Sequence, residues 1–579
     1  MLSFLERWRA PIPWIAIAGT VSCAVISADH GSTPRPGFAP CTAAGLEDAQ
    51  CRTVEVFENR SMRTGRTIPV RVVLLAARAQ RPEPDPLFFI AGGPGQAASS
   101  LADFARETFK DVRRKRDIVL VDVRGTGGSH PLNCDLYPDM ASYFGDLFPR
   151  EAVRRCRRQL EAIADLRQYT TRNLADDLDE VRGVLGYDRV NLYGTSYGSI
   201  AARVYLARHP ERVRSLVIKA IAPMTAMPLL SYARDAQEAL DTLFGDCVAD
   251  SACHAAFPNI RAEARALFAR LDSADRPAQA RDPRTGQSQH VTISRGAFAG
   301  SVLTAMQGPA TAAAIPALIH EAHLGNYAPA ARLIVGVRRV ISSDLSWGMH
   351  LSVLCTEGNP RVDDATIARE SAGSFLGDYR VRQQIQACEE WRRGDSTGFG
   401  VIPASNVPAL LSSGRLDPNT PPRWGHEAAR LLPNSRHLVV RYGSHNFGNL
   451  RGCVDVLMNR FIEAASAAAL DTSCVAKIRF PAFVTAREAP EVPLSRASLD
   501  AFAGVYRKRV PPITVAISPL GQVLQASLRE RKFTLVHIGG NRFRVEEVPG
   551  YQVEFIVNNG RPAKMIFNLQ GRRVSLSRK

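Results

Sequence analysis

The sequence contains no C-x-x-C pair, although it has 11 cysteines. This absence argues against a zinc site or a thioredoxin-like redox centre, because both use closely spaced cysteine pairs. With Cys23 set aside, the other ten cysteines fall into five sequential couples: Cys41, Cys51, Cys134, Cys156, Cys247, Cys253, Cys355, Cys388, Cys453 and Cys474. Disulfide bonds in an oxidising compartment are the favoured interpretation, and the residues alone leave their connectivity open.

Basic runs interleaved with aromatic residues are also missing, despite a formal net charge of +17. Few of the 73 basic residues are lysine, and the arginines are scattered among Asp and Glu, so nucleic-acid binding is not expected. The glycine-rich stretches AGGPGQAASS and RGTGGSH carry neither a Walker lysine nor full dinucleotide spacing. The histidines of HEAH, His320 and His323, stand three residues apart rather than the four of a zinc-protease helix. The sequence therefore predicts no cofactor and no metal.

The first residues have the layout of an export signal. Arg7 and Arg9 precede an uncharged apolar stretch over residues 10–28, and cleavage near Ser27 or Ala28 suits a signal peptidase. Two alternatives to this cleavage stay open. The stretch TVSC ending at Cys23 is a lipobox, although a poor one, so the chain could be a lipoprotein. The apolar stretch is also nearly long enough to remain as a membrane anchor. We expect a secreted or periplasmic protein, attached to a membrane only if this segment, 1–28, is retained or lipidated.

Four further regions follow this segment. Residues 37–225 alternate short apolar runs that end in glycine clusters with helical text, which is typical of an α/β fold with a wound, parallel sheet. Residues 226–400 are rich in Ala and Leu at helical spacing and indicate an inserted helical cap, after which 401–485 completes the α/β core. Residues 495–579 show short alternating segments broken by turn residues, the pattern of a small antiparallel β domain.

Ser196 stands in the pattern G-x-S-x-G, as Gly194-Thr195-Ser196-Tyr197-Gly198. An apolar strand, VNLYG, precedes it and a helical stretch, SIAARVYLARHP, follows it. In this arrangement the strand turns sharply into the helix and exposes the serine, while the glycines avoid collisions with neighbouring backbone. The placement favours a nucleophile over an ordinary turn serine.

A serine nucleophile needs a base and a carboxylate that orients the base, in the chain order Ser, Asp, His for this kind of turn. Asp417 follows the strand PALLSSG in GRLDPNTPP, and His445 follows the strand HLVVRYG in GSHNF. Both stand where the carboxyl ends of parallel strands present side chains. We predict Asp417 as the orienting acid and His445 as the base, since His426 lies within helical text and His437 at a strand start.

The loop AGGPG, directly after the strand PLFFI, is the candidate oxyanion hole. Gly92 and Gly93 let backbone approach a substrate closely, and the amide of Tyr197 would complete the pair of donors. A phosphate cradle is the alternative interpretation of the glycines, and the missing Walker lysine disfavours it.

Taken together, these motifs resemble the α/β-hydrolase-fold serine peptidases related to prolyl iminopeptidase and to secreted bacterial tripeptidyl aminopeptidases. The resemblance covers residues 37–480 and rests on CRTVEVFENR, AGGPG, DVRGTGGSHPLNC, GTSYG, GRLDPNTPP and GSHNF in this order. It implies an α/β-hydrolase core under a helical cap, an acyl-enzyme on Ser196, and release of residues from the free N-termini of peptides. The last region, from 495, resembles small β domains appended to other exported hydrolases.

The resemblance also assigns roles to single residues. Ser196, Asp417 and His445 take the triad positions, and Gly93 with Tyr197 forms the oxyanion hole. It further implies three disulfides, Cys134 with Cys156, Cys247 with Cys253, and Cys453 with Cys474, and structural roles for Asp122 and Arg124 in DVRGTGGS. Ala91 departs from the pattern, because many prolyl iminopeptidases have histidine there.

Glu357, in SVLCTEGNP, matches the family's acidic position at the cap junction and is predicted to bind the substrate's ammonium group. A solvated loop acid is the alternative for this residue. For the whole chain, an esterase or small-amide hydrolase with the same triad stays open, because a fold does not determine a substrate. A β-lactamase-like activity is disfavoured, since the S-x-x-K motif is absent.

Overall fold

The computed structural model describes residues 35–224, 228–358, 362–446, 451–508, 513–528, 531–548, 550–569 and 572–579. The predicted export segment, 1–28, and Cys23 lie outside the described residues. Within these described ranges, no helix has the length and apolar character needed to cross a membrane.

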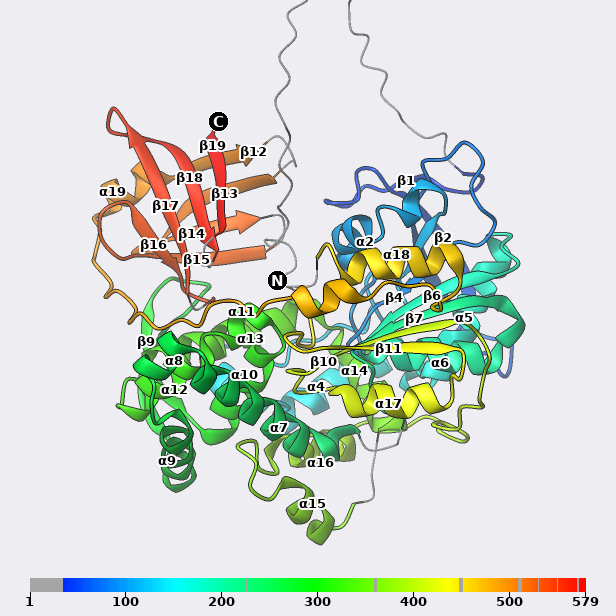
Figure 1. Ribbon diagram of the computed structural model, residues 1–579, viewed down its shortest axis with the longest axis horizontal. Helices are drawn as coiled ribbons and strands as arrows, with labels where there is room; N and C mark the ends of the chain where they lie inside the picture. Colours follow the sequence, from blue (N-terminus) through cyan, green and yellow to red (C-terminus); the bar gives the residue numbers. More distant parts are fainter. Residues whose placement is uncertain are drawn as a thin grey trace, which may run out of the picture.

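A nine-stranded sheet forms the centre of the larger part of the molecule (Figure 1). Six of the nine strands, β5, β4, β6, β7, β10 and β11, run parallel to one another, as the alternation of predicted strands and helices indicates. The pairs β1–β2, β2–β3 and β3–β5 are antiparallel. The antiparallel edge was not predicted; β2 and β3 are joined by a connection too short for a parallel crossover. In spatial order the strands are β1 (Ala39–Pro40), β2 (Gln50–Phe57), β3 (Thr67–Leu75), β5 (Ile118–Val121), β4 (Leu87–Ile90), β6 (Val190–Thr195), β7 (Val213–Lys219), β10 (Ala409–Gly414) and β11 (Ser435–Val440).

Helices cover both faces of this sheet, because successive strand residues point to opposite sides. Phe88 and Leu192 pack with α5 (Thr171–Val184), α6 (Tyr197–Arg208) and α17 (Pro422–Arg430). Phe89 and Tyr193 pack on the other side with α2 (Ala102–Thr108) and α18 (Val454–Ala464). The strands buried on both faces read as continuous apolar runs for this reason. The other helical elements of this part are α3 (Met140–Phe144), α4 (Arg150–Glu161), η1 (Ser99–Leu101), η2 (Val112–Arg114), η3 (Leu166–Gln168), η4 (Pro210–Arg212) and η5 (Ser473–Lys477).

Between β7 and β10 the chain is mainly helical, over the region for which a cap was predicted. A two-stranded hairpin, β8 (Arg276–Arg281) and β9 (Ser288–Ile293), interrupts the helices and was not predicted. The two strand sequences are short and polar on their exposed side, so their periodicity did not distinguish the hairpin from a loop. The helices are α7 (Pro228–Ala249), α8 (Ser251–Ala256), α9 (Ile260–Ser273), α10 (Arg295–Met306), α11 (Pro309–Ala312), α12 (Ile315–His323), α13 (Ala328–Asp344), α14 (Trp347–Glu357), α15 (Asp364–Ser371) and α16 (Tyr379–Glu389).

The C-terminal region is a closed antiparallel barrel of strands β12 to β19, preceded by α19 (Arg496–Phe502) (Figure 1). Its all-β, antiparallel character is confirmed, and closure is what the sequence did not reveal. Aromatic rings fill its interior, with the rings of Phe543 and Phe555 5.4 Å apart. The strands are β12 (Gly504–Lys508), β13 (Ile513–Leu520), β14 (Val523–Leu528), β15 (Arg531–His537), β16 (Arg542–Val545), β17 (Tyr551–Asn558), β18 (Arg561–Leu569) and β19 (Arg572–Arg578).

The barrel packs closely against the helical region. A Cβ added at Gly336 of α13 would lie 2.7 Å from the backbone oxygen of Glu547, and one at Gly286 would lie 2.4 Å from that of Leu520. Arg339 of α13 also makes an ion pair with Glu547. Glycine is therefore required at both contacts for the two backbones to approach.

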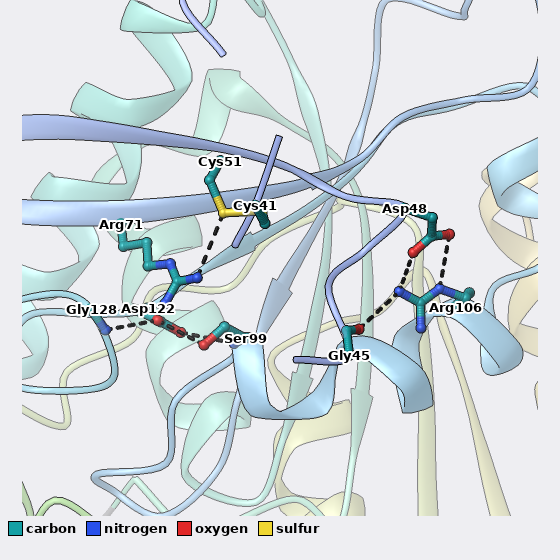
Figure 2. Close-up of a disulfide and its surroundings, with 9 residues drawn as sticks. All are labelled: Cys41, Gly45, Asp48, Cys51, Arg71, Ser99, Arg106, Asp122 and Gly128. Atoms are coloured by element: carbon teal, nitrogen blue, oxygen red, sulfur yellow. Dashed lines mark hydrogen bonds and ion pairs between the residues drawn. A yellow bond between two sulfur atoms is a disulfide. The ribbon is translucent and has the colours of Figure 1, made fainter. Parts of the chain in front are cut away.

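Five disulfides join the ten cysteines of the described residues. The three pairings that the family resemblance implied are present, Cys134–Cys156, Cys247–Cys253 and Cys453–Cys474. The other two bonds are Cys41–Cys51, shown in Figure 2, and Cys355–Cys388, which links α14 to α16.

Removing the Cys355–Cys388 bond is expected to destabilise the protein more than removing the Cys247–Cys253 bond. The first closes a loop with a sequence separation of 33, the second one of 6. Loop-closure entropy then predicts losses in unfolding free energy of about 4 and about 2 kcal/mol for the two double Cys→Ser variants. Urea denaturation measures both, and an equal or larger loss for the short loop would contradict the argument.

Candidate active site

Ser196 occupies the sharp turn between β6 and α6. Its backbone has φ 57° and ψ −125°, a strained conformation for a residue with a side chain. A Cβ at Gly194 would lie 2.2 Å from the oxygen of Gly198, and one at Gly198 would lie 2.5 Å from that of Ile90. Both glycines are therefore needed for the turn, which leaves the serine partly exposed at the end of a buried strand.

Asp417 and His445 are hydrogen-bonded to each other. His445 Nδ1 lies 2.9 Å from Asp417 Oδ2 and 3.0 Å from Oδ1, so Nδ1–H donates to the carboxylate. The carboxylate also accepts from the Thr420 hydroxyl at 2.6 Å and from the amides of Asn419 and Thr420 at 2.9 Å. Burial alone would raise the pKa of Asp417, and the charge and hydrogen bond of His445 together with Thr420 lower it overall. The carboxylate therefore stays ionised and fixes the imidazole.

The sheet places the three predicted residues at one edge. Ser196 follows β6, and Asp417 and His445 follow β10 and β11, with β7 between β6 and β10. Backbone bonds connect these strand ends, from Ser196 N to Lys219 O at 3.1 Å and from Ala220 N to Ser412 O at 2.9 Å. Among the described residues, no hydrogen bond joins Ser196 to His445. The structure thus pairs the acid with the base and brings the serine to the same edge.

The glycine loop after β4 lies against Ser196. A Cβ at Gly92 would stand 3.2 Å from Ser196 Cβ, and Gly93 has φ +112°, which excludes most side chains. Asp122 fixes the far end of this loop by accepting from the amide and hydroxyl of Ser99, each at 2.8 Å, and from the amide of Gly128 (Figure 2). The structural part predicted for Asp122 agrees with these contacts.

Glu357 is 5% exposed and lies at the end of α14. Its two carboxylate oxygens accept from the amide and the hydroxyl of Thr171, both at 2.5 Å, and the same hydroxyl lies 2.6 Å from the phenol oxygen of Tyr197. Burial raises the pKa of Glu357 to about 7, although the Thr171 bonds act in the opposite direction. It is therefore a buried acid behind Tyr197 rather than a solvated loop residue, and its contact with a substrate amine stays a prediction.

Some residues near the site were missed by the sequence reasoning. Thr420 stands three residues after Asp417, and that D-x-x-T spacing is a local signal for side-chain bonds to turn backbone. Thr171 gave no such signal, because its partner Glu357 is remote in the chain. Lys219, at the end of β7, is 6% exposed, and burial lowers its pKa to about 8 while nearby Asp417 raises it.

The histidines passed over in the prediction lie in other settings. His437 Nε2 is 2.9 Å from Ser413 Oγ and its ring meets that of His426 edge to face, while His320 pairs with Glu263. Within the described part of the chain, no three His, Cys, Asp or Glu side chains are grouped to hold a metal ion.

Strand order, a strained serine between strand and helix, and an Asp–His pair after the last two strands define an α/β hydrolase. A family model for the alpha/beta hydrolase fold matches residues 85–301. A second model, described as TAP-like protein, matches residues 373–474.

Three relatives extend these matches. Serine protease Hip1 of Mycobacterium tuberculosis is 24% identical over 422 residues, which are 64% of this chain and 77% of the relative. Tripeptidyl aminopeptidase of Streptomyces coelicolor is 31% identical over 190 residues, 30% of this chain and 35% of the relative. Proline iminopeptidase of Neisseria gonorrhoeae is 32% identical over 141 residues, 24% and 34% of the two chains. The chain thus has the α/β-hydrolase fold, and its predicted resemblance to this group of serine peptidases is confirmed.

Replacing Glu357 with Gln is expected to change how stability depends on pH. Because folding raises the pKa of this carboxyl from 4.5 to about 7, the folded protein holds the proton more tightly than the unfolded chain. The wild type then loses about 3 kcal/mol of unfolding free energy between about pH 4.5 and pH 8, and Glu357→Gln does not. Urea denaturation at pH 5 and pH 8 measures the difference, with exposed Glu389→Gln as control; parallel pH dependences in all three proteins would contradict it.

Proposed function

We propose that this chain is an exported serine peptidase that removes single residues or short peptides from the free N-termini of peptides through an acyl-enzyme on Ser196. The observation that carries the proposal is the strained turn of Ser196 at the same sheet edge as the hydrogen-bonded pair of Asp417 and His445. The names of the similar proteins support peptides as the substrate class.

The proposed reaction begins with His445. Since Nδ1–H donates to Asp417, Nε2 is the unprotonated nitrogen that takes the proton from Ser196 Oγ as the oxygen attacks the scissile carbonyl carbon. The carbonyl oxygen becomes an oxyanion, which the amides of Gly93 and Tyr197 stabilise. His445 then gives its proton to the departing amine nitrogen, and a water molecule, activated by the same base, hydrolyses the acyl-enzyme.

Two features support an aminopeptidase over the esterase alternative. Glu357 lies next to the phenol of Tyr197 through Thr171, and Tyr197 directly follows the nucleophile. A buried acid in this place suits an ammonium ligand, which would draw it into its ionised form. The TAP-like match covers the region from α16 to the end of the core.

The five disulfides suit an oxidising compartment, and the proposed export signal supplies the route to it.

The test is a matched panel of substrates given to the mature protein. The panel contains free-amine aminoacyl and tripeptidyl amides, the same amides with a blocked amine, and simple esters. Cleavage of the free-amine amides alone supports the aminopeptidase. Turnover of esters alone, or equal turnover of free and blocked amides, would overturn it.

A further inference from the structure

Arg380, in the first turn of α16, is a cation without a counter-ion. Among the described residues it takes part in no ion pair and no hydrogen bond, and its NH1 atom is buried without a partner. Its guanidinium lies over the ring of Phe148, 5.3 Å from the centroid. The buried arginines of the described residues all donate hydrogen bonds; Arg124, for example, donates to both carboxylate oxygens of Asp177. Arg380 as a whole is half-buried, but its NH1 atom is withdrawn from solvent. Leaving such a charged group unpaired is unfavourable, so a ligand that pairs with it would be favoured.

Two more unpartnered polar atoms surround the same phenylalanine. His350 is 6% exposed; its Nδ1–H donates to the oxygen of Pro94 at 3.0 Å, and its Nε2 has no partner in the described chain. Trp347, 2% exposed, has an indole N–H that likewise lacks an acceptor there. The ring centroids of His350 and Trp347 are 6.0 and 5.8 Å from that of Phe148. Buried polar groups are rarely left unpaired, and a group of them indicates a missing ligand.

This group adjoins the catalytic loop. His350 contacts Pro94, and the amide of Ser346 at the start of α14 donates to the oxygen of Gly95 at 2.9 Å. Gly92 of the same loop contacts Ser196. Burial raises the pKa of Tyr232 in α7, and the charges of Arg380 and Asp417 also act on this phenol.

No carboxylate of the described residues forms an ion pair with Arg380. Besides burial, the main influences on its pKa are the phenols of Tyr137, Tyr232 and Tyr379 and a second cation, Arg338. Arg338 is itself occupied, since it donates to the backbone oxygens of Tyr143 and Gly145. Arg380 NH1 and the indole N–H of Trp347 are thus buried donors without an acceptor among the described residues.

We propose that Arg380 binds a carboxylate of the peptide substrate, held beside the Gly92–Gly95 loop with the indole N–H of Trp347 as a second donor. This inference rests on the proposed peptidase function and adds a substrate class, namely peptides with a negative charge near the scissile bond. A guanidinium donates two parallel hydrogen bonds to the two oxygens of a carboxylate. A substrate with a neutral side chain or an amide at the same place cannot accept such a charge-assisted pair of bonds. The carboxylate belongs either to an acidic side chain or to the C-terminus of a short peptide.

The experiment compares kcat/KM for matched free-amine peptides in the wild type, Arg380→Met and Arg380→Lys. The first set consists of pairs of peptides that differ only in having Glu or Gln at one position, with one pair for each position. A further pair differs only at the C-terminus, which is a free acid in one peptide and an amide in the other. The control is Arg382→Met, which removes the same charge from the same helix, where Arg382 is exposed and paired with Asp364 at 3.0 Å.

We expect the wild type and Arg382→Met to prefer one carboxylate substrate over its neutral partner by about tenfold or more. Arg380→Met is expected to lose this preference because kcat/KM falls mainly on the carboxylate substrate, and Arg380→Lys to keep part of it. The pair that shows the preference identifies the source of the carboxylate. Peptide cleavage without any carboxylate preference, or an equal loss on both substrates in Arg380→Met, would overturn the inference.

A binding measurement separates this inference from the proposed function. In a Ser196→Ala background, calorimetry compares the free-acid and amide forms, and the Glu and Gln forms, of the same peptides. Tighter binding of a carboxylate form that depends on Arg380 supports the inference even if the wild type cleaves only esters. Equal binding of all forms would count against it whether or not peptides are cleaved.

Discussion

Ser196→Ala is expected to lower kcat/KM by about six orders of magnitude and to leave the fold intact. The alanine lacks the oxygen that attacks the carbonyl, and its methyl group occupies the same strained turn between β6 and α6. The residual rate would come from the oxyanion hole and binding alone. The measurement is turnover of the best substrate of the panel by both proteins at equal concentration, with thermal unfolding to verify the fold.

The chain offers a matched control for this variant. Ser413 forms a second serine–histidine pair, with its hydroxyl 2.9 Å from His437 Nε2. Ser413 is fully buried, however, and burial together with His426 lowers the pKa of His437 to about 4. Ser413→Ala should therefore retain nearly full activity. Loss of activity in Ser413→Ala with retention in Ser196→Ala would place the nucleophile elsewhere.

Asp417→Asn is expected to reduce kcat by about four orders of magnitude. In the wild type, Nδ1–H of His445 donates to the ionised carboxylate of Asp417. The amide of the variant cannot stabilise an imidazolium, and its NH2 group favours the wrong tautomer of His445. Thr420 and the turn amides bind the same side chain, so the substitution also disturbs their bonds. Pre-steady-state measurements of acylation are the direct test.

A second buried acid provides the comparison for Asp417. Asp235 of α7 is also fully buried and accepts from the indole N–H of Trp424 at 3.2 Å, but it has no contact with His445. Asp235→Asn tests what the loss of a buried charge does to folding. If both variants lose activity in proportion to their loss of folded protein, Asp417 is a structural residue and the proposed mechanism is wrong.

The parallel strands, and the places of Ser196, Asp417 and His445 at their carboxyl ends, could be predicted from the sequence because each has a local signal, while the catalytic roles of the three residues stay a prediction. Apolar runs that end in glycine mark β4, β5 and β6, and the G-x-S-x-G pattern marks the turn at Ser196. Asp417 and His445 follow from counting strand ends, since parallel strands expose their carboxyl ends at one edge.

Other features depend on contacts between remote segments, and the sequence alone did not reveal them. Closure of the barrel requires β12 to pair with β19, some seventy residues away by number, and no local pattern encodes that pairing. Glu357 is buried against Thr171 at the start of α5. Arg380 is unpaired because no carboxylate of the described residues is positioned to form an ion pair with it. Such properties are determined by tertiary packing rather than by periodicity.

Every disulfide of the described chain joins two cysteines that are neighbours in the order of cysteines along it. A chain that emerges with its N-terminal end first therefore presents each cysteine's partner before the next pair follows. Oxidation in order of emergence gives the native connectivity without exchange between pairs, so folding should need an oxidant but little help from a disulfide isomerase.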